Sequence, residues 1–80
     1  MTNLTQCVRG GSIDNRPGFV IAFYYNTGLI ETLKARVPHY DREWRELSRT
    51  WWVAEEYAGV LEEMFRNFRT LIYNQTRMEL

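Results

Sequence analysis

The sequence has a single cysteine, Cys7, and a single histidine, His39, among its 80 residues. One cysteine excludes an internal disulfide, and no Cys-x-x-Cys pair or Cys/His cluster indicates a zinc site. No apolar run approaches the roughly 18 residues of a membrane helix, and the N-terminus lacks the apolar core of a signal peptide. We therefore expect a cytoplasmic protein with no metal, no cofactor and no membrane partner.

The sequence also lacks net charge, because its ten basic and ten acidic residues cancel. A neutral chain is not expected to bind nucleic acid strongly by electrostatics alone. Zero net charge does not exclude a local basic patch. Nine of the ten cations are arginine, which suits bidentate phosphate contacts. A GC-rich genome would give the same bias, so composition alone does not choose between the two explanations.

What is present is an aromatic-rich chain of single-domain size, with 45% hydrophobic and 15% aromatic residues. A chain of this length buries only about 60% of its unfolded surface, so its core is small. Gly10, Gly11 and Pro17 interrupt any pattern near the N-terminus. We predict a flexible arm over residues 1–17, a folded domain over 18–74 and a C-terminal tail over 75–80.

Five elements follow the arm in the order β-α-β-β-α, counting the two strands of a hairpin separately. Phe19 to Tyr25 (FVIAFYY) is apolar throughout and predicts a strand. Asn26 is a candidate N-cap for a helix that ends before Pro38. The helix carries apolar residues at helical spacing, and its last turn is basic. These apolar residues are Leu29, Ile30, Leu33 and Val37.

From His39 the pattern alternates with a period of two and predicts a hairpin whose loop is residues 45–48. This loop pairs Trp44 with Arg49, Arg42 with Trp51 and Tyr40 with Val53. A single amphipathic helix is then predicted from about Glu55 to Tyr73. The fold class is α+β, a layer of three mostly antiparallel strands packed with two helices.

The three tryptophans divide by strand face in this hairpin. Trp44 and Trp51 share the face with Val53, which predicts that both are structural. Trp52 lies on the more polar face and is predicted to be exposed. Three roles for Trp52 stay open. It stacks on a base, it anchors a protein interface, or it simply packs against Tyr24 or the arm.

Two segments resemble the HARP-like domain. Tyr25 to Lys34 (YNTGLIETLK) resembles the domain's Y-[DN]-x-x-L-I-x-x-L-K start, and Arg42 to Val53 (REWRELSRTWWV) resembles its R-x-[WF]-D-P-E-T-[KR]-x-W-x-V hairpin. The turn departs from the pattern, because Arg45-Glu46-Leu47-Ser48 replaces D-P-E-T and leaves Leu47 at the tip as a candidate contact. The match covers about residues 19–68.

The resemblance implies a β-α-β-β-α module that helps annealing helicases and related phage and archaeal helicases engage DNA, often at forks. No GxxxxGK[ST] loop is present, so this chain is not expected to be the motor. We expect a non-enzymatic accessory module, compatible with a phage or mobile-element origin, that binds single-stranded, duplex or forked DNA. Trp52 would stack on a base, and phosphates would be held by Lys34, Arg36, Arg42, Arg45 and Arg49.

Two alternatives remain open. The basic hairpin residues are equally explained as solvated strand edges that prevent aggregation. The last helix offers more apolar surface than a small core can cover, which favours a protein-interaction module: a homodimer, a helicase-docking protein or a phage inhibitor of a host nucleic-acid enzyme. The residues of that interface would be Phe65, Phe68, Leu71, Ile72 and Tyr73.

An enzyme is not expected. Cys7 lies in the predicted arm, where a nucleophile is poorly positioned. Asp41 and Glu43 share a predicted strand face and form a weak candidate for a carboxylate pair or metal site, but charge alternation on a surface hairpin explains them better. Glu55-Glu56 and Glu62-Glu63 are adjacent on a helix, so the members of each pair do not face each other.

Overall fold

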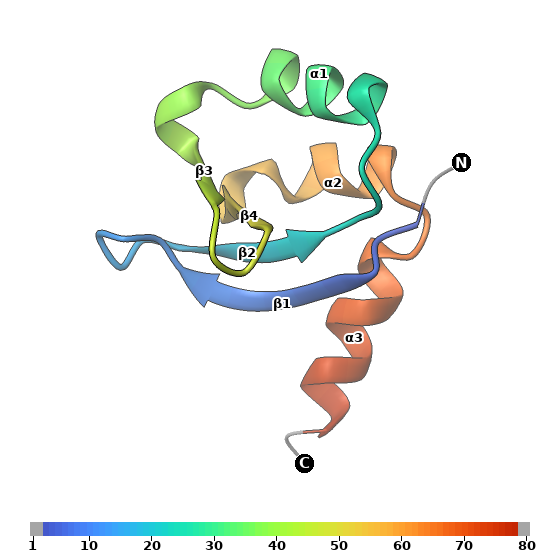
Figure 1. Ribbon diagram of the computed structural model, residues 1–80. Coiled ribbons are helices and arrows are strands. Elements are labelled where there is room, and N and C mark those ends of the chain that lie inside the picture. The colour runs from blue at the N-terminus through green and yellow to red at the C-terminus, as the bar shows by residue number, and fades with distance from the viewer. Residues whose placement is uncertain (1–2, 79–80) are drawn as a thin grey trace.

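The computed structural model describes the backbone of residues 3–78 and the side chains of residues 3–73. In chain order it contains β1 (Gln6–Gly11), β2 (Pro17–Ala22), α1 (Thr27–Arg36), the 3-10 turn η1 (His39–Asp41), β3 (Arg42–Arg45), β4 (Thr50–Ala54), the 3-10 turn η2 (Glu55–Tyr57), α2 (Ala58–Met64) and α3 (Phe68–Met78). The fold class is α+β, as the sequence predicted. Figure 1 shows α1 and α2 above the strands and α3 running away from the sheet beside β1.

The sheet has four strands instead of three, in the order β1-β2-β4-β3, and every neighbouring pair is antiparallel. The prediction of a flexible arm is wrong for residues 6–11, which form β1 and pair along the whole of β2. Gly10, one of the glycines that suggested an arm, instead allows close packing. A Cβ atom on Gly10 would lie 2.9 Å from Cγ2 of Val20, and glycine within a strand often marks such an approach.

The β3–β4 hairpin forms, but its register differs by two residues from the prediction. Trp44 lies opposite Trp51 and Arg42 opposite Val53, so the loop consists of residues 46–49. The segment predicted to begin the strand, His39–Asp41, is the turn η1. A shift of two residues keeps every side chain on its face, so the division of the tryptophans into Trp44 and Trp51 against Trp52 is confirmed.

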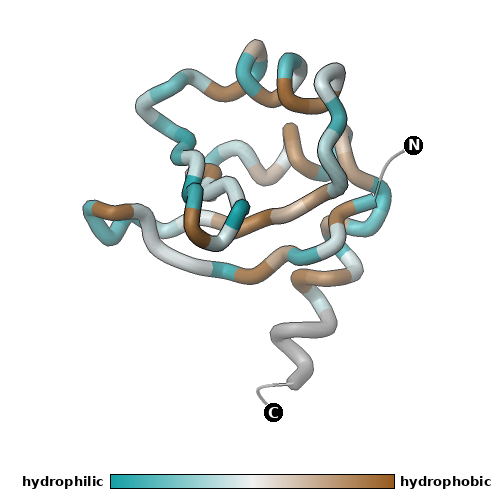
Figure 2. The backbone as a smooth tube through the Cα atoms, viewed as in Figure 1, coloured by the Kyte–Doolittle hydropathy of each residue, from teal (hydrophilic) through white to brown (hydrophobic). Residues whose placement is uncertain are grey.

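The core lies between the sheet and the helices. Asn26 caps α1 as predicted, since its Oδ1 accepts a hydrogen bond of 3.0 Å from the amide of Leu29. Leu33 and Val37 are fully buried. Figure 2 shows hydrophobic segments of α1, α2 and β2 facing this layer. The buried core side chains are Leu4, Cys7, Phe19, Ile21, Leu33, Val37, Trp51, Val53, Leu61, Met64, Phe65 and Phe68.

The single helix predicted from Glu55 to Tyr73 is wrong, because the chain is extended at Phe65 between α2 and α3. Asn67 explains the break. Its Oδ1 accepts from the amide of Leu4 at 2.8 Å and its Nδ2 donates to the Leu4 carbonyl at 2.9 Å. This contact joins residues 63 positions apart and turns Phe65 into the core, where it is completely buried.

The break also corrects the predicted protein interface. Phe65 and Phe68 belong to the core, and the ring of Phe68 meets that of Phe19 edge-on at 5.0 Å. Leu71 and Ile72 are partly buried against the core, and Tyr73 is exposed. The predicted C-terminal tail is wrong as far as Met78, to which α3 extends, and its last two positions lie outside the described residues.

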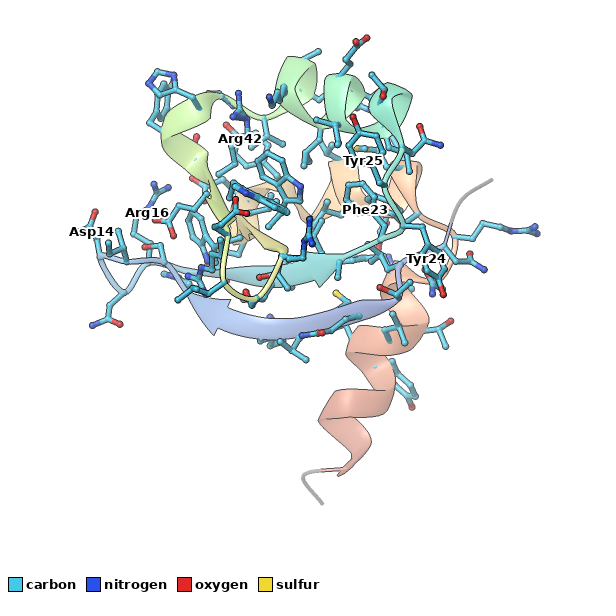
Figure 3. The ribbon with its side chains drawn as sticks, viewed as in Figure 1. Asp14, Arg16, Phe23, Tyr24, Tyr25 and Arg42 are labelled. Atoms are coloured by element: carbon cyan, nitrogen blue, oxygen red, sulfur yellow. The ribbon has the colours of Figure 1, made fainter. Side chains whose placement is uncertain are left out.

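The opposite face of the sheet holds Trp52, which is 1% exposed. Its Nε1 donates to the carbonyl of Gly10 at 3.1 Å, and the guanidinium carbon of Arg16 lies 5.4 Å from the centre of its ring. Arg16 belongs to the turn between β1 and β2, which Figure 3 shows with Asp14 at the far end of the hairpin. The turn therefore covers Trp52, and the prediction that Trp52 is exposed is wrong.

A buried carboxylate holds this turn in place. Asp41 is 7% exposed. Its carboxylate accepts a hydrogen bond from Arg16 at 2.7 Å and another from the hydroxyl of Tyr57 at 2.8 Å. Arg16 also donates to the carbonyl of Tyr40 at 3.0 Å. The hydrogen bonds from Arg16 and then Tyr57 lower the pKa of Asp41 below its usual range, because both stabilise the ionised form.

Asp41→Asn is therefore expected to lower the melting temperature at neutral pH. A carboxyl whose pKa is lowered in the folded state stabilises the protein above its unfolded pKa of about 3.9, and this contribution disappears as the pH falls through the lower folded value. Thermal unfolding followed by circular dichroism at a series of pH values should show the difference between wild type and variant shrinking below about pH 4. Asp14→Asn, an exposed carboxylate of the same turn, is the control. Equal melting temperatures for wild type and Asp41→Asn at neutral pH would contradict the role of this network.

Candidate functional site

A groove opens between α1, the segment that follows β2, and the β3–β4 hairpin. Its volume is about 700 Å³, within the usual range for a ligand site. We call it the aromatic groove. It is lined by Phe23, Tyr24, Tyr25, Ile30, Lys34, Trp44, Glu46, Arg49 and Trp51.

Two tryptophans of the hairpin form one wall of the aromatic groove. Trp44 and Trp51 are cross-strand neighbours whose ring centres are 5.2 Å apart. Trp51 is buried as predicted, but Trp44 is 46% exposed, which corrects its assignment to the core. Trp44 lies on the edge strand β3, and its indole Nε1 donates to Oε1 of Glu46 at 2.8 Å. This bond orients an exposed ring at the rim of the groove.

Two tyrosines form the opposite side. The sequence predicted that the strand continues to Tyr25, but β2 ends at Ala22, and Tyr24 and Tyr25 are 81% and 83% exposed. In Figure 3 both lie with Phe23 where the chain leaves the sheet for α1. Exposed aromatic rings gathered at one site are typical of binding surfaces. The sequence did not identify either tyrosine as a site residue, because an uninterrupted apolar run gives no sign of where a strand ends.

Of the five cations predicted to bind phosphate, two line the groove and three do not. Lys34 and Arg49 line it and are exposed. No ion pair found within residues 3–73 includes either of them. Both cations are therefore free to meet an anionic ligand in the same groove as the aromatic rings.

The other three cations contact the protein itself. Arg36 pairs with Glu63 at 2.8 Å. Arg42 Nε donates to the carbonyl of Val37 at 3.0 Å, and Arg45 donates to the carbonyl of Gly11 at 2.6 Å. Figure 3 shows Arg42 beside the connection between α1 and β3. The Arg36 pair joins α1 to α2, and the other two bonds join the end of α1 and the β1–β2 hairpin to β3. We therefore assign these three residues to the structure.

Arg49 has an unusual backbone, with φ at 57°. This left-handed region suits glycine and asparagine, and it costs other residues energy. The second such residue among those described is Asn15, whose residue type suits it. Strain of this kind is often retained at functional sites. An arginine that ends the hairpin loop with its side chain in the groove fits that pattern.

Trp52, in contrast, cannot contact a ligand, since it is covered by the turn that carries Arg16. The sequence correctly expected one exposed tryptophan in the hairpin but selected the wrong one. The alternation of side chains along a strand puts Trp44 and Trp52 on opposite faces of the sheet. It does not show which face a distant turn will cover. The exposed indole is that of Trp44.

The structure also places the candidate reactive groups of the sequence. Burial raises the pKa of Cys7 to about 12, although Arg9 opposes the shift, so the side chain is a neutral thiol and a poor nucleophile. Within residues 3–73 no cluster of three or more His, Cys, Asp or Glu side chains is arranged to hold a metal ion. The helices between residues 3 and 78 are all too short or too polar to span a bilayer.

Comparison with known proteins gives no match: no family model fits the chain, and no curated protein or solved structure is significantly similar to it. The function must therefore be argued from the groove itself.

Proposed function

We propose that this chain is a small, non-enzymatic module that binds single-stranded DNA in the aromatic groove. The observation that carries the proposal is the half-exposed ring of Trp44 in the same groove as Lys34 and Arg49. Aromatic rings that stack on bases, beside cations that contact the backbone, are the general means of binding single strands. Duplex bases already stack on one another, so the exposed rings favour unpaired DNA.

The expected binding energy comes more from stacking than from charge. Each stacked base contributes about 1–3 kcal/mol, and Trp44, Tyr24 and Tyr25 offer exposed rings. Two phosphate contacts on a single strand give a salt slope of only about −1.4. A shallow slope agrees with a chain whose net charge is zero.

The HARP-like resemblance suggests a context for this activity. Under that hypothesis the module accompanies a helicase and holds unpaired DNA near a fork or junction. The chain would be a helper of the motor, and a phage or mobile element would be a suitable source of such a small accessory protein.

Fluorescence anisotropy tests the proposal. Labelled single-stranded, duplex and forked DNA are titrated at about 50 mM and about 200 mM salt, while tryptophan emission is followed. We expect the single strand and the fork to bind more tightly than the duplex, with quenching of tryptophan emission. Absence of binding to all three at the lower salt concentration would refute the proposal.

A protein partner is the second candidate, and two exposed apolar residues favour it. Leu47 at the tip of the β3–β4 hairpin is fully exposed, and Ile13 in the β1–β2 turn is 85% exposed. Ile13 lines a smaller hollow with Glu43, Trp44 and Arg45. An apolar partner, including a second copy of the chain, would fit this surface. Light scattering distinguishes a homodimer from the monomer of 9.6 kDa.

A further inference from the structure

Glu46 is the residue that a simple phosphate-binding groove does not explain. Its carboxylate lies in the aromatic groove together with Lys34 and Arg49, where a negative charge opposes binding of a polyanion. The fold does not require the charge, because Glu46 is an exposed residue of the hairpin loop. No ion pair found within residues 3–73 includes it.

Glu46 is nevertheless held in position. Its Oε1 accepts the indole N–H of Trp44 at 2.8 Å, which places the carboxylate at the edge of the ring on which a base would stack. An ionised carboxylate only accepts hydrogen bonds, and its two oxygens offer about four sites. One site is used by Trp44, so the remaining ones can meet donors on the edge of a stacked base.

We infer that Glu46 makes the aromatic groove selective for bases that present hydrogen-bond donors, with guanine preferred to thymine. This inference rests on the proposed binding of single-stranded DNA, in which the Watson–Crick edge is free to be recognised, as it is in single-stranded RNA. Guanine presents a ring N–H and an adjacent amino group on that edge, so both can donate to one carboxylate. Thymine presents one N–H between two carbonyl oxygens, which the carboxylate repels.

Adenine and cytosine fall between these extremes, because each offers one amino group beside a ring nitrogen that accepts. The carboxylate therefore weakens binding of the phosphate backbone but makes binding selective among bases. Lys34 and Arg49 hold the phosphates and do not distinguish bases. In this arrangement the three charged side chains of the groove have separate roles.

The experiment uses labelled thymidine oligomers of about eight nucleotides, a typical length for a single-strand site. One oligomer carries a central guanine, one carries hypoxanthine at that position, and one is unmodified. Hypoxanthine lacks the amino group of guanine. Wild type is expected to bind the guanine oligomer about tenfold more tightly than the thymidine oligomer, with hypoxanthine between them.

Glu46→Gln is the matched variant. Glutamine keeps an oxygen for the N–H of Trp44 but loses the charge and the second acceptor oxygen. We expect it to bind the guanine and thymidine oligomers equally and to bind the thymidine oligomer more tightly than wild type does. Glu46→Ala removes the carboxylate without introducing a donor and should also abolish the preference. Circular dichroism spectra check that both variants fold.

The possible outcomes separate the two proposals. Binding with no difference between guanine and thymine in wild type overturns the base preference and leaves the single-strand site standing. A preference that persists in both Glu46 variants overturns the role of Glu46. Failure of every oligomer to bind refutes the single-strand site itself, and the base preference with it.

Discussion

Reversal of both charges in the aromatic groove, in the double variant Lys34→Glu/Arg49→Glu, should weaken binding of single-stranded DNA by about 100-fold. A hydrogen bond to a charged group contributes about 1.5 kcal/mol or more, and each 1.4 kcal/mol changes the dissociation constant tenfold. Loss of the two phosphate contacts should also make the slope of log K against log salt concentration less negative by about 1.4. Anisotropy titrations at two salt concentrations measure both effects.

The control is a double variant with the same change of net charge outside the groove, Arg66→Glu/Arg69→Glu. Both arginines are exposed on the connection to α3 or on α3 itself. Among the described side chains, Arg69 forms a surface ion pair with Glu62, and a pair of this kind contributes little to stability. This variant should retain most of the affinity. If the two double variants lose affinity equally, the cations of the groove have no special role and the binding depends on net charge alone.

Replacement of Gly18 by alanine is expected to have the largest effect on stability. Gly18 lies in β2 beneath the indole of Trp52, and a Cβ atom there would lie 2.6 Å from the indole Nε1 and would collide with the carbonyl oxygen of Val53. A backbone atom of the central sheet cannot move aside without disturbing the pairing of β2 with β4. Overpacking of this kind costs about 3 kcal/mol, a large part of the stability of a small domain.

Gly59→Ala is the matched control for this substitution. Gly59 lies within α2, and no atom lies within 4 Å of a Cβ added there. Alanine should stabilise the helix by about 1 kcal/mol relative to glycine. Urea denaturation of both variants measures the difference in the free energy of unfolding. A Gly18→Ala variant as stable as wild type would show that Trp52 can leave its place over β2 without loss.

The parts of the fold that depend on nearby residues were predictable. The N-cap at Asn26 was predicted from its side-chain oxygen, and Leu33 and Val37 were assigned to the apolar side of the helix from their spacing. The cap is confirmed, and both apolar side chains are fully buried. The separation of Trp44 and Trp51 from Trp52 follows from the alternation of side chains along a strand, so it survived an error of two residues in the register. Lys34 and Arg49, which the sequence grouped with the hairpin as candidate phosphate contacts, both line the aromatic groove.

The parts that depend on residues distant in the sequence were missed. A strand such as β1, which contains two glycines, has a weak local signal and is stabilised by its pairing with β2. The break before α3 depends on the two hydrogen bonds between Asn67 and Leu4. No helical periodicity contains this information, because an uninterrupted amphipathic pattern favours one long helix.

The placement of the three tryptophans shows the same division. Local sequence determined that the hairpin would present tryptophans on both faces, because the alternation of side chains is a property of the strand itself. Which tryptophan meets solvent was decided by contacts between elements. Arg16 and Asp41 hold a distant turn over Trp52, while Trp44 stays at the free edge of the sheet. Burial is a property of the whole packed chain, and for that reason the exposed ring of Trp44 became evident only in three dimensions.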